Sequence, residues 1–306
     1  MIFYNPFMIL MKSNVFSYSL DEPELSNLED IRNWILSKNP ANDKSTHVWY
    51  INLPPEIKKK FYDISLCKKI INSFTNHFGN DIIINPIFDM NEVYVSAPAN
   101  VKDTSDKIFF TRHIDGPYFY MPFSYCYRMI IGMDDNEEIT TCFDMVPYEK
   151  TIKKGDVIAF DFHRECHYIK KNEMKVNKDF RVVLKVHYCI YPKWACYFGE
   201  LLAKLSVHYD KNFRNLFLFT ISPETFFEKN LARYMIFMSK VVHDIEYYIG
   251  YNNLMITFLS YLFRNIIFDI FIIIINMKYE NNNLIIRRDM KYYTFLFLMI
   301  ILNKLV

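Results

Sequence analysis

The sequence predicts an α+β protein with a mainly-β core and helical flanks. Helical spacing dominates up to about residue 90, short β-type runs follow from Val93 to about Tyr191, and helical character returns from about Cys196. Strands this short and closely spaced favour an antiparallel barrel or sandwich over βαβ units. We therefore expect three regions: an N-terminal helical flank (1–92), a β core (93–195) and a helical C-terminal region with an apolar tail (196–306).

The helices of the two flanks are marked by their ends. The stretch "EPELSNLEDIRNWILSK" has acidic residues early and Lys38 late, and "PPEIKKKFYDISLCKKIINSFTNHFG" begins with proline and stops at Gly79. Farther along, Ser222 is a candidate N-cap, Pro223 fits the first helical position, and Gly250 ends the pattern. These residues are typical of helix boundaries.

The β region is predicted from runs rich in β-branched and aromatic residues, separated by turn residues. These runs are "VYVSAP", "KIFFTRHI", "YRMIIGM", "EEITTCF", "DVIAFDF" and "RVVLKVHYCIYP".

Composition limits the function classes. The 306 residues carry a formal net charge of +2, with 51% hydrophobic and 23% charged residues, which argues against disorder and against a polyanionic partner. A nucleic-acid partner is not expected, although the clusters "IKKKF" and "IIRRDMK" leave it open. The six cysteines are scattered without a CxxC pair, so we expect buried thiols in a reducing, intracellular compartment. The N-terminal "MIFYNPFMILMKSNVF" has no basic leader, and we expect no signal peptide.

The apolar tail allows two interpretations. Residues 254–277 are long enough to span a bilayer but contain Arg264, Asn265 and Asp269, and an ionised group at the bilayer centre costs roughly 2.5–3.5 kcal/mol. The final apolar stretch before Lys304 is shorter than a spanning helix. Buried or interfacial helices and a membrane anchor both stay open, and with them membrane contact.

The candidate site begins at "TRHIDGPYFY" (111–120), where His113 and Asp115 lie two apart before Gly116. A His-x-Asp pair is a weak signal by itself. Non-haem iron(II) oxygenases, however, bind their metal with two histidines and one carboxylate. The segment "KKGDVIAFDFHRECHYI" (153–169) supplies a second histidine after a turn and a buried strand, either His163 or His167.

A cation follows in "KDFRVVLKVHY", where Arg181 opens a β-branched strand 14 residues after His167 (181 minus 167). A guanidinium there can pair bidentately with a carboxylate. In this order and at these spacings, His113, Asp115, His167 and Arg181 make residues 93–192 resemble the iron(II)- and 2-oxoglutarate-dependent dioxygenases.

The resemblance implies a double-stranded β-helix, also called a jelly roll. It implies that His113, Asp115 and His167 bind Fe(II), that 2-oxoglutarate chelates the metal, and that Arg181 pairs with its far carboxylate. Dioxygen is then the second cosubstrate, and a C–H bond is hydroxylated with release of succinate and CO2.

Several assignments stay open at this level. His163 competes with His167, since residues four apart share a face of an extended strand. Asp161 and Glu165 are further carboxylates that could approach the metal. Carboxylates at strand ends, however, are more often exposed to solvent.

The cosubstrate pocket has its own alternatives. Arg128 is the other cation that could meet 2-oxoglutarate, and Tyr127 could donate a hydrogen bond to a carboxylate. His187 lies six residues beyond Arg181, and we interpret it as a core histidine.

The alternative function is a membrane-associated or interaction protein whose β-barrel domain lacks chemistry. For an oxygenase, a small molecule, a lipid or a protein side chain all fit as substrate. The oligomeric state is not predicted.

Overall fold

The computed structural model describes residues 15–42, 45–96, 110, 112–116, 121, 123–143, 148–172, 180–221, 225–227, 229–230 and 233–234. Most of the helix predicted from Ser222 to Gly250 and the whole tail 254–306 lie outside them. The elements are β1 (Val15–Ser19), α1 (Glu24–Leu36), β2 (Thr46–Trp49), η2 (Tyr50–Asn52), α2 (Pro55–Ser65), α3 (Lys68–Phe78), β3 (Ile82–Pro86), η3 (Phe88–Met90), β4 (Glu92–Ser96), β5 (Tyr125–Gly132), β6 (Ile139–Phe143), β7 (Tyr148–Thr151), β8 (Asp156–Asp161), β9 (His167–Lys171), β10 (Arg181–Pro192), η5 (Lys193–Ala195) and α4 (Cys196–Ile221).

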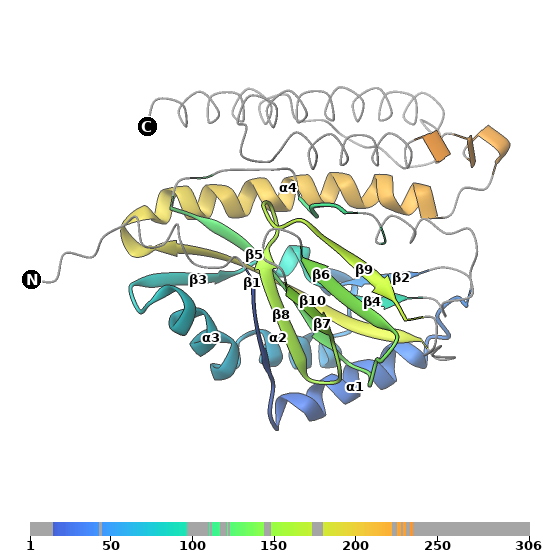
Figure 1. The fold of residues 1–306 in the computed structure, drawn as a ribbon, viewed down its shortest axis with the longest axis horizontal. Coiled ribbons are helices and arrows are strands. Elements are labelled where there is room, and N and C mark those ends of the chain that lie inside the picture. Colours follow the sequence, from blue (N-terminus) through green and yellow to red (C-terminus); the bar gives the residue numbers. More distant parts are fainter. Residues whose placement is uncertain are drawn as a thin grey trace, which may run out of the picture.

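Two antiparallel sheets form the core of the described structure (Figure 1). The larger has the order β1-β8-β5-β10-β4-β2, and β3 pairs with one end of β10. The smaller has the order β7-β6-β9. This mainly-β arrangement is compatible with the expected jelly roll.

Strand β10 is the centre of the large sheet. It pairs with β5 on one side and with β4 and β3 on the other, and every residue after Arg181 is buried. Because side chains alternate between the two faces of a strand, Val182, Leu184 and Val186 point to one face and Arg181, Val183 and Lys185 to the other. The first set joins the hydrophobic core, and the second lines a pocket.

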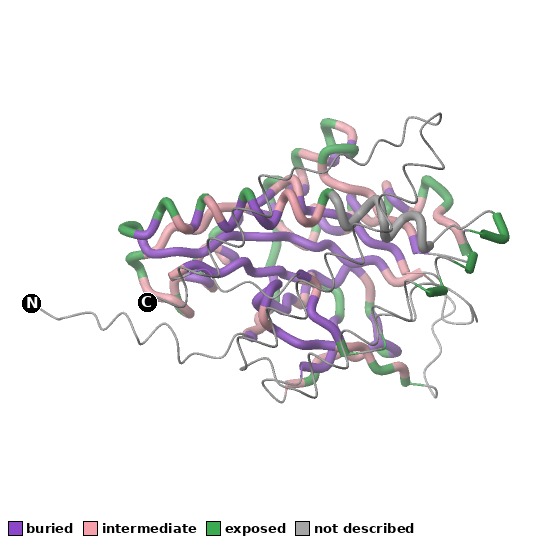
Figure 2. Tube along the Cα trace, turned by 90° about the horizontal axis from the view of Figure 1, so that it is seen from above, coloured by how far each residue is buried: buried purple, intermediate pink, exposed green. Residues whose placement is uncertain are grey.

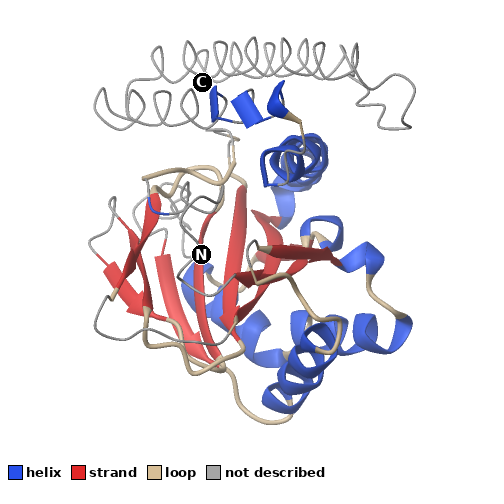
Figure 3. Ribbon diagram, turned by 90° about the vertical axis from the view of Figure 1, so that its right-hand side faces the viewer, coloured by secondary structure: helices blue, strands red, loops and turns tan. Residues whose placement is uncertain are grey.

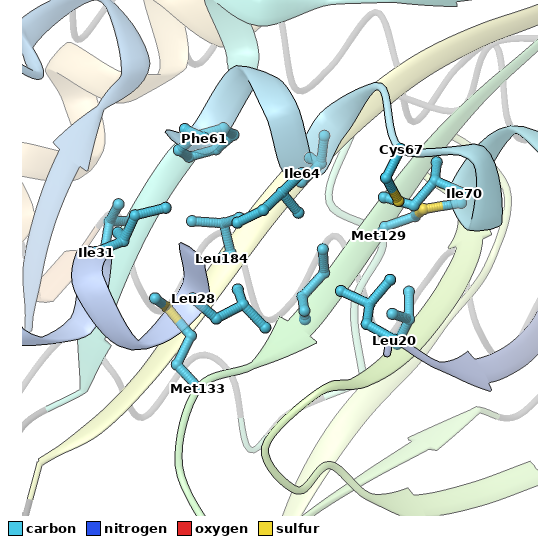
Figure 4. Packing of buried hydrophobic residues seen from close by; sticks show 14 of the residues in the cluster. Leu20, Leu28, Ile31, Phe61, Ile64, Cys67, Ile70, Met129, Met133 and Leu184 are labelled. Carbon is cyan, nitrogen blue, oxygen red and sulfur yellow. The ribbon is translucent and has the colours of Figure 1, made fainter. Parts of the chain in front are cut away.

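Helices α1, α2 and α3 cover the apolar face of the large sheet (Figure 3). Leu28 and Ile31 of α1, Phe61 of α2 and Ile70 of α3 pack towards Leu184 of β10 in one core (Figure 4). The buried residues run as continuous stretches through the interior (Figure 2). Truncating a large buried side chain here to alanine costs about 3–5 kcal/mol.

The structure places strands in the N-terminal region, where the sequence predicts flanking helices and loops. Strands β1, β2 and β3 pair with β8, β4 and β10. They are four or five residues long and exist through pairing with distant partners, which no local pattern encodes. The helix predicted within residues 22–38 is present as α1, Glu24–Leu36. The stretch from Pro54 to Gly79 divides into α2 and α3 instead of forming one helix.

After the core, helix α4 packs against β10 and β5 through Leu202, Ala203 and Leu205. This bears out helical character directly after Cys196. None of the helices within the described residues has the length and hydropathy to cross a membrane. All six cysteines are free thiols, and only Cys196 is exposed.

Candidate metal centre

Three side chains converge between the two sheets. One donor atom each from His113, Asp115 and His167 lie within 4.8 Å of one another. The imidazole Nε2 atoms of His113 and His167 lie 3.8 and 3.4 Å from the Asp115 carboxylate oxygens, and the two imidazole rings are 4.5 Å apart between centroids. Both histidines are buried. The group is therefore a compact set of two imidazoles and one carboxylate.

Backbone pairing brings the two histidines together across 54 positions (167 minus 113). The His113 N–H donates to the His167 carbonyl at 3.0 Å, and the His167 N–H donates back at 2.9 Å. His113 thereby extends the small sheet beside β9. Three residues later the Gly116 N–H donates to the Phe162 carbonyl at 3.0 Å, which fixes the backbone on the far side of Asp115.

Gly116 is required by close packing at this point. A Cβ on it would lie 2.4 Å from Nδ1 of His163 and 2.6 Å from the ring of Phe162. Real Cβ atoms do not come that close, so a side chain here would displace the His163 and Phe162 rings or the backbone next to Asp115.

The Asp115 carboxylate is ionised inside the protein. Burial raises its pKa, but the charge of Arg128, followed by the protonated forms of His167 and His113 in acid, outweighs burial and holds the pKa well below its ordinary value. Nη1 of the Arg128 guanidinium forms an ion pair with Asp115 Oδ2 at 2.6 Å. A negative ligand is thus present at neutral pH, as a cation site requires.

His167 is poised as a neutral ligand. Burial lowers its pKa more than the nearby Asp115 raises it. Its Nδ1 lies 3.2 Å from the backbone carbonyl of Glu165; a carbonyl only accepts, so Nδ1 carries the proton. The Nε2 lone pair consequently faces Asp115, which is the usual arrangement of a metal-binding histidine.

His163 points away from this group. Its Nε2 lies 2.8 Å from the Ser206 hydroxyl of α4, and it is not among the three clustered donors. Strand β8 ends at Asp161 and β9 starts at His167, so a turn separates the two histidines and shared strand parity does not apply.

The two other candidate carboxylates are also outside the three-residue group. Asp161 lies 3.4 Å from Arg164 and accepts the His163 N–H at 3.0 Å. Glu165 is buried, and its part in the site is the backbone carbonyl that orients His167.

A pocket opens in front of the three donors. It is lined by His113, Asp115 and His167, by the cations Arg128, Arg181 and Lys185, and by Tyr94, Ile130, Thr141, Ile169 and Val183. Its charged lining therefore comprises three cations and one carboxylate, which favours an anionic ligand.

Arg181 contributes an incompletely satisfied donor to this pocket. Its Nε atom is buried and has no hydrogen-bond partner among the described residues. Burial lowers its pKa, against the opposing effects of Tyr94, Asp134 and Glu138, yet an arginine stays protonated in proteins. A carboxylate is the group that would satisfy it.

The structure does not bring Tyr127 into the pocket, and this corrects its expected place there. Tyr127 points to the helix-covered face of β5, with its ring 5.8 Å from that of Phe74 and 5.3 Å from that of Phe78. Arg128, the next residue, takes the pocket face because neighbouring strand residues alternate.

Sequence reasoning missed Lys185. Its ammonium group lies 2.7 Å from the buried Glu92 carboxylate and 4.4 Å from the centroid of the Tyr94 ring. Burial raises the pKa of Glu92, but Lys185 and then His47 lower it to well below its usual value. The available signal was a lysine within the apolar run of β10, four residues from Arg181 and on the same face.

Comparisons with known proteins give structural matches only. No protein-family model matches the chain, and no curated protein matches its sequence. Matching solved structures include SnoN, a non-heme alpha-ketoglutarate-dependent epimerase from nogalamycin biosynthesis, at 12% identity and a TM-score of 0.43, covering 61% of this chain and 87% of that one.

Two further matches are the viral collagen prolyl hydroxylase vCPH from Paramecium Bursaria Chlorella virus-1 and HygX from Streptomyces hygroscopicus, the latter with nickel and 2-oxoglutarate bound. The first is 12% identical, with a TM-score of 0.38 and coverage of 59% of this chain and 91% of that one. The second is 9% identical, with a TM-score of 0.38 and coverage of 61% and 86%. These likenesses are loose, so the function proposed below depends on the residues of the site.

Proposed function

We propose that the protein is an iron(II)- and 2-oxoglutarate-dependent oxygenase with a double-stranded β-helix core. The observation that supports this most is the buried group of His113, Asp115 and His167, with donor atoms within 4.8 Å of one another. Two imidazole nitrogens and one carboxylate oxygen are the donor set that non-haem iron(II) oxygenases use, and this set leaves positions open on the metal. The residues present fit the metal.

The cosubstrate follows from the charge of the pocket. 2-Oxoglutarate is a dianion with one end suited to chelation and a carboxylate at the other. In this proposal Arg181 on β10 binds the far carboxylate, which is supported by its buried Nε atom that lacks a partner among the described residues. A charge-assisted pair of this kind is about twice as strong as a neutral hydrogen bond.

The proposed reaction is the hydroxylation of a C–H bond. The substrate R–H, dioxygen and 2-oxoglutarate give R–OH, succinate and CO2, so that one oxygen atom enters each of the alcohol and succinate. Iron supplies the redox chemistry. The protein's own residues hold the ligand set, exclude water and anchor the cosubstrate. Neither His113 nor His167 acts as a general base, because both nitrogens that face the site are assigned to the metal.

The experiment uses the full-length chain, purified without oxygen and supplied with iron(II). On titration with 2-oxoglutarate we expect the visible metal-to-ligand charge-transfer band in the wild type and its loss in His113→Ala. A wild type without the band contradicts the oxygenase and favours the alternative, a β-barrel protein that binds partners without chemistry. Band formation in His113→Ala contradicts the ligand set.

The substrate class is tested next by succinate release. Lipid, peptide, small-metabolite and nucleotide pools are offered in parallel, and we expect release above the uncoupled background with one of the first three. Release with nucleic acid alone would overturn the expected class of partner.

A further inference from the structure

Arg128 is held from two sides at once. Its Nη1 forms an ion pair with Oδ2 of Asp115 at 2.6 Å, and its Nε donates a hydrogen bond to Nε2 of His187 at 2.8 Å. Its guanidinium carbon lies 4.7 Å from the centroid of the Phe162 ring. All of these groups are buried or nearly so. The guanidinium therefore has one defined position between the large sheet and the segment that carries Asp115.

The chemistry of the donors fixes the state of His187. A guanidinium has only donors, so Nε2 of His187 must accept, and its proton must be on Nδ1. The Asn91 amide oxygen lies 3.3 Å from Nδ1 and also accepts the His187 backbone N–H at 2.8 Å. Burial, followed by the charge of Arg128, holds the pKa of His187 well below its usual value, in agreement with a neutral ring.

Strand register builds this contact into the sheet. His187 of β10 and Arg128 of β5 are directly opposite each other, and such cross-strand neighbours are held at a fixed separation. The pair is thus part of the most buried strand pair of the large sheet, whereas Asp115 lies beside the small sheet.

We propose that Asn91, His187 and Arg128 form a positioning relay that fixes the orientation of the Asp115 carboxylate, so that it faces the His113 and His167 imidazoles as one defined metal ligand. This inference rests on the proposed function. It assigns Arg128 to the metal ligand and not to the far carboxylate of 2-oxoglutarate, which leaves that carboxylate to Arg181. Partners of this kind behind a metal ligand typically change metal affinity 10- to 100-fold.

The test measures Mn(II) binding to the full-length chain from the electron paramagnetic resonance signal of free Mn(II). Arg128→Lys keeps the charge but cannot contact Asp115 and His187 together, and His187→Phe removes the acceptor; we expect each to weaken Mn(II) binding about 10- to 100-fold. His187→Gln, whose amide oxygen can accept, should recover part of the loss. The matched control is Arg32→Lys, which alters another arginine–aspartate pair, to Asp134, and should bind Mn(II) as the wild type does.

Wild-type affinity in both Arg128→Lys and His187→Phe would overturn the relay. If His187→Phe fails to fold, the Mn(II) affinity of Arg128→Lys alone tests the relay. A variant Arg128→Lys with normal Mn(II) affinity but weakened 2-oxoglutarate binding would instead make Arg128 a cosubstrate anchor. If the wild type binds Mn(II) and the relay variants do not, but iron(II) and 2-oxoglutarate give no charge-transfer band, the relay stands and the proposed function fails.

Discussion

His113 and His167 are joined by a reciprocal pair of backbone hydrogen bonds, 3.0 and 2.9 Å long. The pairing, and not the side chains alone, sets the distance between the two imidazoles. It also places the His167 imidazole beside Asp115, whereas the His163 imidazole lies against the Ser206 hydroxyl.

This choice is tested by two glutamine variants. His167→Gln should lose at least 100-fold in Mn(II) affinity, because it removes a ligand nitrogen. His163→Gln should keep wild-type affinity at some cost in thermal stability, because its buried bond to Ser206 changes. Equal losses of affinity in both variants would mean that His163 also contacts the metal.

A second prediction separates the two faces of the large sheet. Arg181→Gln should raise the Kd for 2-oxoglutarate about 10- to 100-fold, since a hydrogen bond to a charged group contributes about 1.5–3 kcal/mol. Mn(II) affinity should stay unchanged. Tyr127→Phe, on the helix-covered face, is the control and should leave the Kd for 2-oxoglutarate within twofold. A large effect of Tyr127→Phe would contradict its observed direction.

The close packing at Gly116 leads to a third prediction. Gly116→Ala should lower both the thermal midpoint and Mn(II) affinity, because overpacking costs about 1–3 kcal/mol and moves the backbone next to Asp115. The control is Gly155→Ala: Gly155 has a φ of +79° and a Cβ there would meet Leu25 at 2.5 Å, far from the site. It should lose stability while Mn(II) affinity holds.

The buried His187 predicts a pH dependence of stability for the metal-free chain. Its folded pKa lies well below the unfolded value of about 6.5, so the unfolded state binds the proton first as pH falls. The stability it contributes is full above about pH 6.5 and is lost below it. The free energy of unfolding, measured with urea, should therefore fall more steeply from pH 7 to pH 5 in the wild type than in His187→Gln. The two slopes should differ by up to about 1.4 kcal/mol per pH unit. Parallel slopes would show that His187 does not titrate differently on folding.

Much of the β core was predictable from local patterns. The runs that became β4, β5, β6, β8 and β10 are rich in β-branched and aromatic residues and bounded by turn residues, and α1 carries its own helical spacing. Strands β1, β2 and β3 were not predictable in this way, because they are short and depend on partners far along the chain. Conversely, α2 and α3 look like one helix until the chain turns at Leu66 and Cys67.

The candidate site divides in the same way. His113, Asp115 and Arg181 could be named as candidates from the sequence, because a metal and a dianionic ligand would constrain residue type and order; their roles stay a prediction. The relay through His187 could not, since Arg128 and His187 become neighbours only through the register of β5 and β10. The alternation of side chains along β5 also determines whether Tyr127 or Arg128 faces the pocket. That alternation can be used only once it is known which face of β5 the helices cover.

The two ends of the proposed cosubstrate lie on different sheets. Of the proposed metal ligands, His167 begins β9 of the small sheet and His113 forms a bridge beside it, while Arg181 begins β10 of the large sheet. A bound 2-oxoglutarate consequently bridges the sheets, and its binding energy adds to the energy that holds them together. At a ligand concentration of 100 times Kd this linkage amounts to about 2.7 kcal/mol. The loaded protein should thus melt higher than the metal-bound protein alone, and Arg181→Gln should reduce the difference at the same ligand concentration.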